Sequence, residues 1–288
     1  MTKEREGEFL MLALAFIESW FPILSISAMA YVGALHTYVY SLVIALIFFV
    51  AIMYKKDKFK ELKNQKAYKS LLLTSFWITL LFTLVFVGMR YTTAGNMAVI
   101  IFLQLLFAYF YFNVIGKEAL DKLHLLGAIF MGLGALLILT PSDLIFNKGD
   151  FLILLGAAIA PFANFYQKQA REFCSSETIL GFRTVAGLPF IALLAYMFEP
   201  SVTYENFKLA LPYIAIIGTL IYVVSKIMWI EALHRISITK VSALMGLVPA
   251  MTLFFAYLFL HESPNVRELF GIIPLLYGGY LITRKVVL

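Results

Sequence analysis

Cysteine and charge are both scarce in this chain. Cys174 is the only cysteine among 288 residues, which excludes an internal disulfide framework and a site built from several thiolates. Asp, Glu, Lys and Arg together make up 14% of the residues, whereas a soluble globular domain usually has about 25%. Hydrophobic residues reach 62%, and the mean hydropathy is +0.88. This balance excludes a soluble globular domain and indicates a membrane protein.

Sequence motifs of catalysis and cofactor binding are missing as well. The chain has no Gly-x-Ser-x-Gly and no phosphate-binding Gly-x-x-x-x-Gly-Lys, and "GLGALLIL" from Gly132 lacks the third glycine of a dinucleotide site. The histidines are scattered without a ligand-like pair, at His36, His124, His234 and His261. We therefore expect no catalytic site, no cofactor and no metal, and hence no enzyme.

Ten apolar stretches follow one another along the chain, each close to the roughly 20 residues that a helix needs to cross a bilayer core. Helices satisfy their own backbone hydrogen bonds within one span, and the short alternating segments of an outer-membrane barrel are missing. The sequence therefore predicts an all-α integral membrane protein with ten transmembrane helices. We place them at residues 9–30, 34–53, 70–89, 94–113, 123–140, 151–170, 178–198, 211–231, 240–260 and 268–283.

The lysines and arginines are distributed very unevenly between the two sides of these spans. If the N-terminus is cytoplasmic, 17 of them lie on the cytoplasmic side and four on the other, which follows the positive-inside rule. Both termini are then cytoplasmic, and membrane topology explains the net charge of +6 without any nucleic acid. The lysine-rich segment 55–69 is expected to be a solvated loop, with binding of anionic membrane lipid as the alternative.

One pattern occurs twice in the chain, 144 residues apart. A Glu is followed nine residues later by Gly and seven residues after that by another Gly, as Glu118, Gly127, Gly134 and again as Glu262, Gly271, Gly278. The shift lays the first five spans over the last five. An odd number of spans in each half reverses the direction of the second copy, so we expect two inverted five-helix repeats, residues 1–144 and 145–288.

Two roles are open for the residues of this repeated pattern. A carboxylate at the end of a span can cap the next helix or accept hydrogen bonds from interfacial amides, while glycines seven apart lie on one helix face and permit close packing. Direct contact with a substrate is the less favoured alternative. We therefore interpret the pattern as a folding element that each half requires.

The two segments that carry this pattern resemble a known family. They are "MRYTTAGNMAVIIFLQLLFAYFYFNVIGKEALDKLHLLGAIFMGLGALLIL" (89–139) and "ALHRISITKVSALMGLVPAMTLFFAYLFLHESPNVRELFGIIPLLYGGYLI" (232–282). Each is similar to the EamA-type repeat of the drug/metabolite transporter superfamily, whose ten-helix permeases are built from two such repeats. The resemblance implies a central pathway walled by spans 1–4 and 6–9, in a carrier of the bacterial inner membrane that usually exports small metabolites.

Two departures from the family pattern bear on the pathway. Gln104 and Leu105 stand where the second copy has Val248 and Pro249, so we expect the fourth span to lack the kink that proline produces. The arginine of the second helix in each repeat is matched only by Arg183, which argues against symmetric substrate chemistry.

Three charged residues lie well inside predicted spans, away from the span ends, where an unpaired charge costs several kcal/mol. Glu18 could couple transport to proton binding, or could form a salt bridge with Lys226 or Arg183 for assembly alone. Lys226 could line a cavity or extend its side chain toward the cytoplasmic interface near Glu231. The same two positions are open for the side chain of Arg183. If both cations face a cavity, it favours a carboxylate or a phosphate.

Uncharged polar side chains add weaker candidates for the pathway. Tyr222, Ser225, Lys226 and Trp229 share one helix face by three- and four-residue steps. Six further polar residues could line the pathway, with interhelical hydrogen bonding as their alternative role. They are Trp20, Asn96, Gln104, Asn164, Tyr166 and Gln167.

These observations together predict a secondary transporter that moves small polar metabolites by alternating access. Amino acids and related small anions are the leading substrates, and export is the expected direction. Nucleotide-linked or phosphorylated compounds are the alternative substrates, and a lipid-handling or assembly protein without transport is the alternative class. A homodimer is left open.

Overall fold

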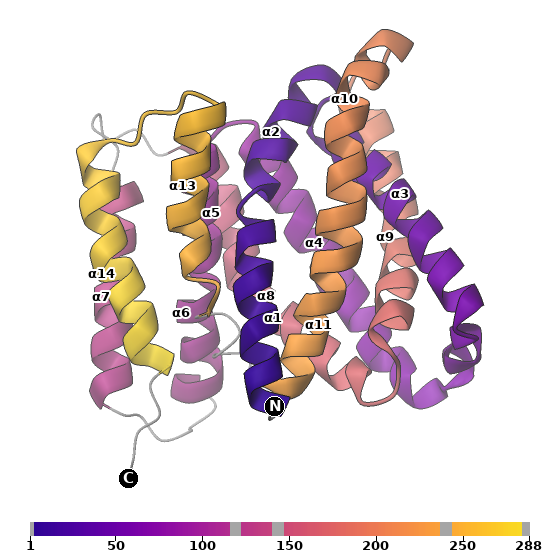
Figure 1. The fold of residues 1–288 in the computed structure, drawn as a ribbon, viewed down its shortest axis with the longest axis horizontal. Coiled ribbons are helices and arrows are strands. Elements are labelled where there is room, and N and C mark those ends of the chain that lie inside the picture. Colours follow the sequence, from indigo (N-terminus) through magenta and orange to yellow (C-terminus); the bar gives the residue numbers. More distant parts are fainter. Residues whose placement is uncertain (1–2, 116–121, 140–146, 237–243, 284–288) are drawn as a thin grey trace.

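The computed structural model describes residues 3–115, 122–139, 147–236 and 244–283. Helices make up all the regular structure in these ranges, as the sequence predicts. The start of the first helix and the end of the last one lie at the same end of the bundle (Figure 1), which we call the terminal face. The repeat residue Glu118 lies outside the described residues, so its predicted capping role stays a prediction.

The first half of the chain begins with a broken helix. α1 ends at Glu18, a turn covers Ser19 and Trp20, and α2 restarts with Pro22 in its first turn, where proline needs no hydrogen-bond donor. The hydroxyl of Thr252 donates to the carbonyl of Ser19 at 3.1 Å, so the break leaves this carbonyl satisfied. The elements of this half are α1 (Lys3–Glu18), α2 (Phe21–Val32), α3 (Ala34–Lys55), η1 (Lys58–Lys63), η2 (Gln65–Ala67), α4 (Tyr68–Met89), α5 (Ala94–Phe102), α6 (Gln104–Tyr109), η3 (Phe110–Ile115) and α7 (Lys122–Leu139).

The second half contains a long helix with a π-helical middle section. This section, η4, lies between α10 and α11 and ends directly before Lys226. Such wide turns are rare and occur often at functional sites. The elements of this half are α8 (Lys148–Arg171), α9 (Ser176–Phe198), α10 (Tyr204–Ile216), η4 (Ile217–Ser225), α11 (Lys226–Arg235), α13 (Leu247–Phe259) and α14 (Val266–Thr283).

The fourth span differs from its prediction, and a turn precedes the last helix of the ninth span. The fourth span does break, between Phe102 and Gln104, although it has no proline. The expectation of an unkinked helix is therefore wrong. In the second half, a turn at Met245 and Gly246 precedes α13, close to the corresponding place in the 144-residue shift.

Seven helical stretches in the described residues are long and apolar enough to cross a membrane. Two further apolar helices, Lys122–Gly134 and Leu247–Phe259, are shorter, and the first of them directly follows residues outside the described ranges. The predicted count of ten spans is thus not reached by length and composition alone and stays a prediction. The seven stretches are Phe9–Val32, Ala34–Lys55, Gln65–Met89, Ala94–Phe112, Lys148–Arg171, Ser176–Phe198 and Tyr204–Arg235.

Helices of the first half pack against helices of the second throughout the bundle. α7 contacts α14 at one edge and α3 contacts α9 toward the other edge, with α5 and α13 between (Figure 1). α4 packs against α8, and the corresponding pair in the second half, α10 and α11, packs against α2 and α1. The outer faces carry exposed apolar side chains such as Ile129 and Phe270, as expected for surfaces that meet lipid.

Glycines allow helices α7 and α14 to pack with their backbones close together. A Cβ on Gly134 would lie 2.5 Å from the backbone nitrogen of Leu275 and 2.6 Å from the carbonyl oxygen of Gly271. A Cβ on Gly278 would overlap the carbonyl oxygen of Gly127 in the same way. The repeated glycines therefore face each other across the two halves, which is the close packing that their spacing predicts.

Carboxylates cap two helices at the end opposite the terminal face. Glu262 accepts hydrogen bonds from the backbone nitrogen of Ala94 at 3.1 and 3.2 Å, so it caps α5 of the first half. The sequence suggested capping of the next helix, α14, but there Asn265 and Glu268 form their own reciprocal cap. Glu199 caps α3 by accepting from three backbone nitrogens, those of residues 34–36.

Candidate substrate cavity

A cavity lies inside the bundle, between helices of both halves. About 110 Å³ of it is open to the centre of a water molecule, and one water needs roughly 10–15 Å³ by this measure. The cavity therefore has room for several waters or one small molecule. Apolar side chains such as Phe21, Phe82 and Ile101 form much of its wall. Its charged and amide side chains are Glu18, Gln104, Asn164, Gln167, Arg183 and Lys226.

Glu18 lies at the break between α1 and α2, and it is 9% exposed. Its Oε1 atom lies 2.5 Å from Nζ of Lys226 and also accepts a short hydrogen bond from the Ser225 hydroxyl. A carboxylate at the C-terminal end of a helix is disfavoured by the helix dipole. The ammonium of Lys226 offsets both the unfavourable dipole and the cost of burying the carboxylate. Removing either partner would leave one charge unpaired inside the bundle.

Lys226 points into the cavity and does not extend to the terminal face. Besides the contact with Glu18, its Nζ lies 5.6 Å from the ring centre of Phe82, within the range of a cation–π interaction. Glu231, which we considered as a partner at the interface, is instead bound by Arg171 and Arg235. The interpretation of Lys226 as an interfacial lysine is therefore wrong.

Arg183 is 6% exposed and begins a chain of amide hydrogen bonds along the cavity wall. Its Nη1 donates to Oε1 of Gln167 at 2.8 Å, and Gln167 donates to Oδ1 of Asn164 at 3.3 Å. Oδ1 of Asn164 also accepts from the indole nitrogen of Trp229 at 3.2 Å, while Nδ2 donates to Gln104 at 3.4 Å. This chain joins α6, α8, α9 and α11 and fixes the orientation of the guanidinium.

Three predicted pathway residues lie elsewhere. Trp20 stacks on Phe255 with ring centres 4.4 Å apart, and it does not line the cavity. Asn96 does not line it either, and its buried Oδ1 has no hydrogen-bond partner among the described residues. Tyr222 lines a second, smaller cavity beside the first. The structure thus brings together Glu18, Asn164, Arg183, Lys226 and Trp229, whose roles in transport stay predictions.

The aromatic part of the wall was not predicted from the sequence. Phe82 lies over Lys226, and its ring lies 5.6 Å from that of Tyr222 and 5.9 Å from that of Tyr38. Phe21 meets Tyr222 edge to face at 6.4 Å. These residues sit in apolar runs rich in Phe and Tyr, so no pattern in the sequence separates cavity aromatics from those that face lipid.

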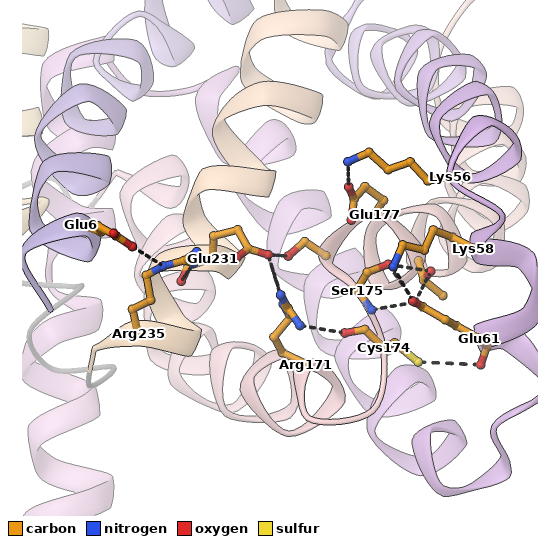
Figure 2. A network of polar contacts seen from close by, with 12 residues as sticks. Glu6, Lys56, Lys58, Glu61, Arg171, Cys174, Ser175, Glu177, Glu231 and Arg235 are labelled. Carbon is orange, nitrogen blue, oxygen red and sulfur yellow. Dashed lines mark hydrogen bonds and ion pairs between the residues drawn. The ribbon is translucent and has the colours of Figure 1, made fainter. Parts of the chain in front are cut away.

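A polar network joins the two halves at the terminal face (Figure 2). Glu61, in the loop after α3, accepts from the backbone nitrogen and hydroxyl of Ser175 at 2.7 and 2.8 Å and from the hydroxyl of Thr178 at 2.7 Å. Cys174 lies beside it, with Sγ 3.9 Å from the Glu61 carbonyl oxygen. Lys56 pairs with Glu177 at 2.6 Å. The loop of the first half is thereby tied to the start of α9.

The same network continues across the end of α11. Arg171 donates to Glu231 Oε1 at 3.0 and 3.1 Å, and Arg235 reaches both Glu231 at 2.6 Å and Glu6 at 3.8 Å. Within the loop, burial alone would raise the pKa of Glu61, but its hydrogen bonds from Lys58, Ser175 and Thr178 lower that pKa to about 2. Glu61 is therefore ionised at neutral pH, and the ties at this end are charge-assisted.

Apolar helices around a small charged cavity define a membrane protein with the interior of a carrier rather than a soluble binding domain. The comparison with known proteins identifies it further. The sequence matches the EamA-like transporter family over residues 5–140 and again over residues 147–284. The chain belongs to this family, part of the drug/metabolite transporter superfamily, and the resemblance drawn from the sequence is confirmed.

Individual relatives carry transporter names. A protein of Archaeoglobus fulgidus named "Uncharacterized transporter" is 29% identical over 217 residues, which cover 72% of this chain and 73% of the relative. "Uncharacterized transporter YyaM" of Bacillus subtilis is 26% identical over 184 residues, covering 60% and 59%. One crystal structure superposes with a TM-score of 0.72 at 15% identity, covering 96% of this chain and 95% of the other. That likeness supports the fold alone.

Proposed function

We propose that the protein is a secondary transporter that carries small polar metabolites across the membrane by alternating access. The observation that supports this most directly is the position of Glu18, Lys226 and Arg183 in one cavity between the two halves. Buried charges of this kind are expensive in a membrane and normally serve a substrate or ion pathway. Folding alone would need neither the cavity nor a guanidinium in its wall.

Zwitterions such as amino acids are the substrate class that this cavity suits best. Arg183 can hold a carboxylate through two parallel hydrogen bonds, and Glu18 can accept an amino group once Lys226 moves aside. The apolar wall around Phe21 and Phe82 would receive the remainder of the molecule. A proton on Glu18 would release Lys226, which gives a route for coupling to a proton gradient.

Phosphorylated metabolites are a second candidate, because two cations, Arg183 and Lys226, line the cavity. However, Lys226 is already paired with Glu18 at 2.5 Å, so among the described residues that line the cavity Arg183 is the one cation without an ion-pair partner. The volume of about 110 Å³ open to water also favours a small substrate over a nucleotide-linked one.

The proposed mechanism includes two inverted five-helix repeats, residues 1–144 and 145–288, with ten spans in all. Three features support it: the family match falls in two consecutive ranges, the α4–α8 contact has its counterpart between α10–α11 and α1–α2, and both ends of the described chain share one face (Figure 1). With 17 lysines and arginines on one side, we place that face in the cytoplasm. Export, a bacterial inner-membrane location and a homodimer are further parts of this proposal.

The test compares metabolites in medium and cytosol for cells that express the wild-type chain, Lys226→Met or Lys208→Met at matched membrane abundance. Lys208 is exposed near the start of α10 and serves as the control. We expect one compound to leave wild-type and Lys208→Met cells faster than empty-vector cells, and Lys226→Met to abolish that difference. If no compound differs from the empty vector in several media, export is contradicted, and a lipid-handling role becomes the better explanation.

A further inference from the structure

A second, smaller cavity shares Arg183 with the main cavity. It is enclosed by α3, α4, α9 and η4, and its polar lining comes from Tyr38, Thr79, Arg183, Thr184 and Tyr222. About 10 Å³ of it is open to the centre of a water molecule. Since a single water needs roughly 10–15 Å³ by this measure, the cavity suits one occupant of about that size.

The charges around Arg183 do not balance. Glu18 is the acidic residue among those lining the main cavity, and it is already bonded to Lys226 and Ser225. In the described part of the chain no carboxylate lies within ion-pair distance of Arg183, whose hydrogen-bond acceptor is the neutral amide of Gln167. A buried guanidinium without a counter-charge is strongly disfavoured, so a negative ion beside it would be stabilised.

Tyr222 supplies an independent observation that points to a ligand. Its side chain is 2% exposed and lines the small cavity, and its hydroxyl has no hydrogen-bond partner within the described residues. A buried hydroxyl without a partner is destabilising, because it has lost its hydrogen bonds to water and gained none in exchange. Thr184 also lines this cavity, but within the described residues its hydroxyl donates to the carbonyl of Leu180 at 2.8 Å and does not partner the hydroxyl of Tyr222. An occupant of the cavity that accepts a hydrogen bond would satisfy Tyr222.

We propose that this cavity binds one monatomic anion of chloride size, held by the guanidinium of Arg183 and the hydroxyl of Tyr222. Such an ion supplies the missing negative charge and accepts the hydrogen bond from Tyr222 at once. A water molecule could satisfy the hydroxyl but would leave the charge of Arg183 uncompensated. Polyatomic anions such as sulfate exceed the space, so the site should distinguish chloride and bromide from them.

The test is thermal unfolding of the purified full-length protein in detergent, in sodium chloride or sodium gluconate at equal ionic strength. We expect the melting temperature of the wild-type chain to rise with chloride and to saturate, and bromide to act similarly. Tyr222→Phe should lose most of this rise. Tyr213→Phe is the matched control, because Tyr213 stacks on Tyr31 and lies outside both cavities, and it should respond as the wild-type chain does.

Equilibrium binding of radioactive chloride to the wild-type chain tests the site without any variant. Saturable binding of one ion per chain that bromide displaces and gluconate does not would support it. The proposal is overturned if no chloride binds above background, or if Tyr222→Phe keeps the full chloride response. Neither result bears on metabolite transport, which the export assay measures separately.

Discussion

At the scale of single residues, the Glu18–Lys226 pair carries a testable energetic consequence. Both side chains are about one-tenth exposed, at 10% and 11%. Removing one member of such a pair typically costs about 3–5 kcal/mol, whereas replacing both is often nearly neutral. We expect Lys226→Met to lower the free energy of unfolding in detergent clearly, and the Glu18→Gln, Lys226→Met double variant to recover most of it. Equal losses in the single and double variants would show that the unpaired carboxylate of Glu18 is not the cause of the loss.

The sequence identified Glu18, Lys226 and Arg183 from the cost of charge in a membrane, and all three line the main cavity. It left the partners open, because Glu18 and Lys226 are 208 residues apart and either cation could have met the carboxylate. Trp20 was predicted for the pathway by its place in the first span. Trp20 lies at the helix break, and its ring stacks on Phe255. The spacing of residues in the sequence does not predict this orientation.

At the scale of helices, the contact between α7 and α14 depends on glycines that touch backbone. Gly134→Ala would bring its Cβ to 2.5 Å from Leu275 N, so the helices must move apart. We expect a loss of about 1–3 kcal/mol in unfolding free energy. Gly132→Ala is the matched control on the same helix, because a Cβ there meets nothing within 4 Å and alanine favours helix.

These two variants are compared by thermal unfolding in one detergent. Gly134→Ala should unfold at a lower temperature than the wild-type chain, and Gly132→Ala at the same or a higher one. Equal melting temperatures for all three would refute the close packing. The glycine spacing predicted this packing from sequence, but not which helix would be the partner. The break at Leu103 was missed because no proline marks it.

At the scale of the whole molecule, the sequence predicted the helical membrane fold and the family, since both depend on composition and on repetition along the chain. The number of spans is harder to derive from length and composition. The broken helices α1–α2 and α5–α6 still form single membrane-length stretches, but the apolar helices Lys122–Gly134 and Leu247–Phe259 are shorter than a full span. The network at the terminal face was also not predicted. Its members, such as Glu61 and Ser175, are distant in sequence and look like ordinary loop residues.

This network should act as the closed gate of the terminal face if one half rocks against the other. Cys174 reports on it, because it is the only cysteine and is 3% exposed beside Glu61. Burial and the Glu61 charge raise the pKa of its thiol to about 11, so it should react slowly with maleimide. Glu61→Ala removes the tie to Ser175 and should raise the labelling rate several-fold. Lys60→Ala, which removes only the exposed ion pair with Asp57, should leave it unchanged.

Glu61→Gln separates opening of the gate from the loss of charge. It removes the carboxylate charge near Cys174 but retains an oxygen that can accept from Ser175, so it should label more slowly than Glu61→Ala. Loss of the carboxylate charge is common to Glu61→Ala and Glu61→Gln, so its effect on the thiol pKa should be similar in both variants. The excess labelling rate of Glu61→Ala over Glu61→Gln, measured at one pH, therefore reports the opening of the gate. If Glu61→Ala labels no faster than the wild-type chain, the network does not close this face, and rocking must be sought at the Glu199 and Glu262 caps.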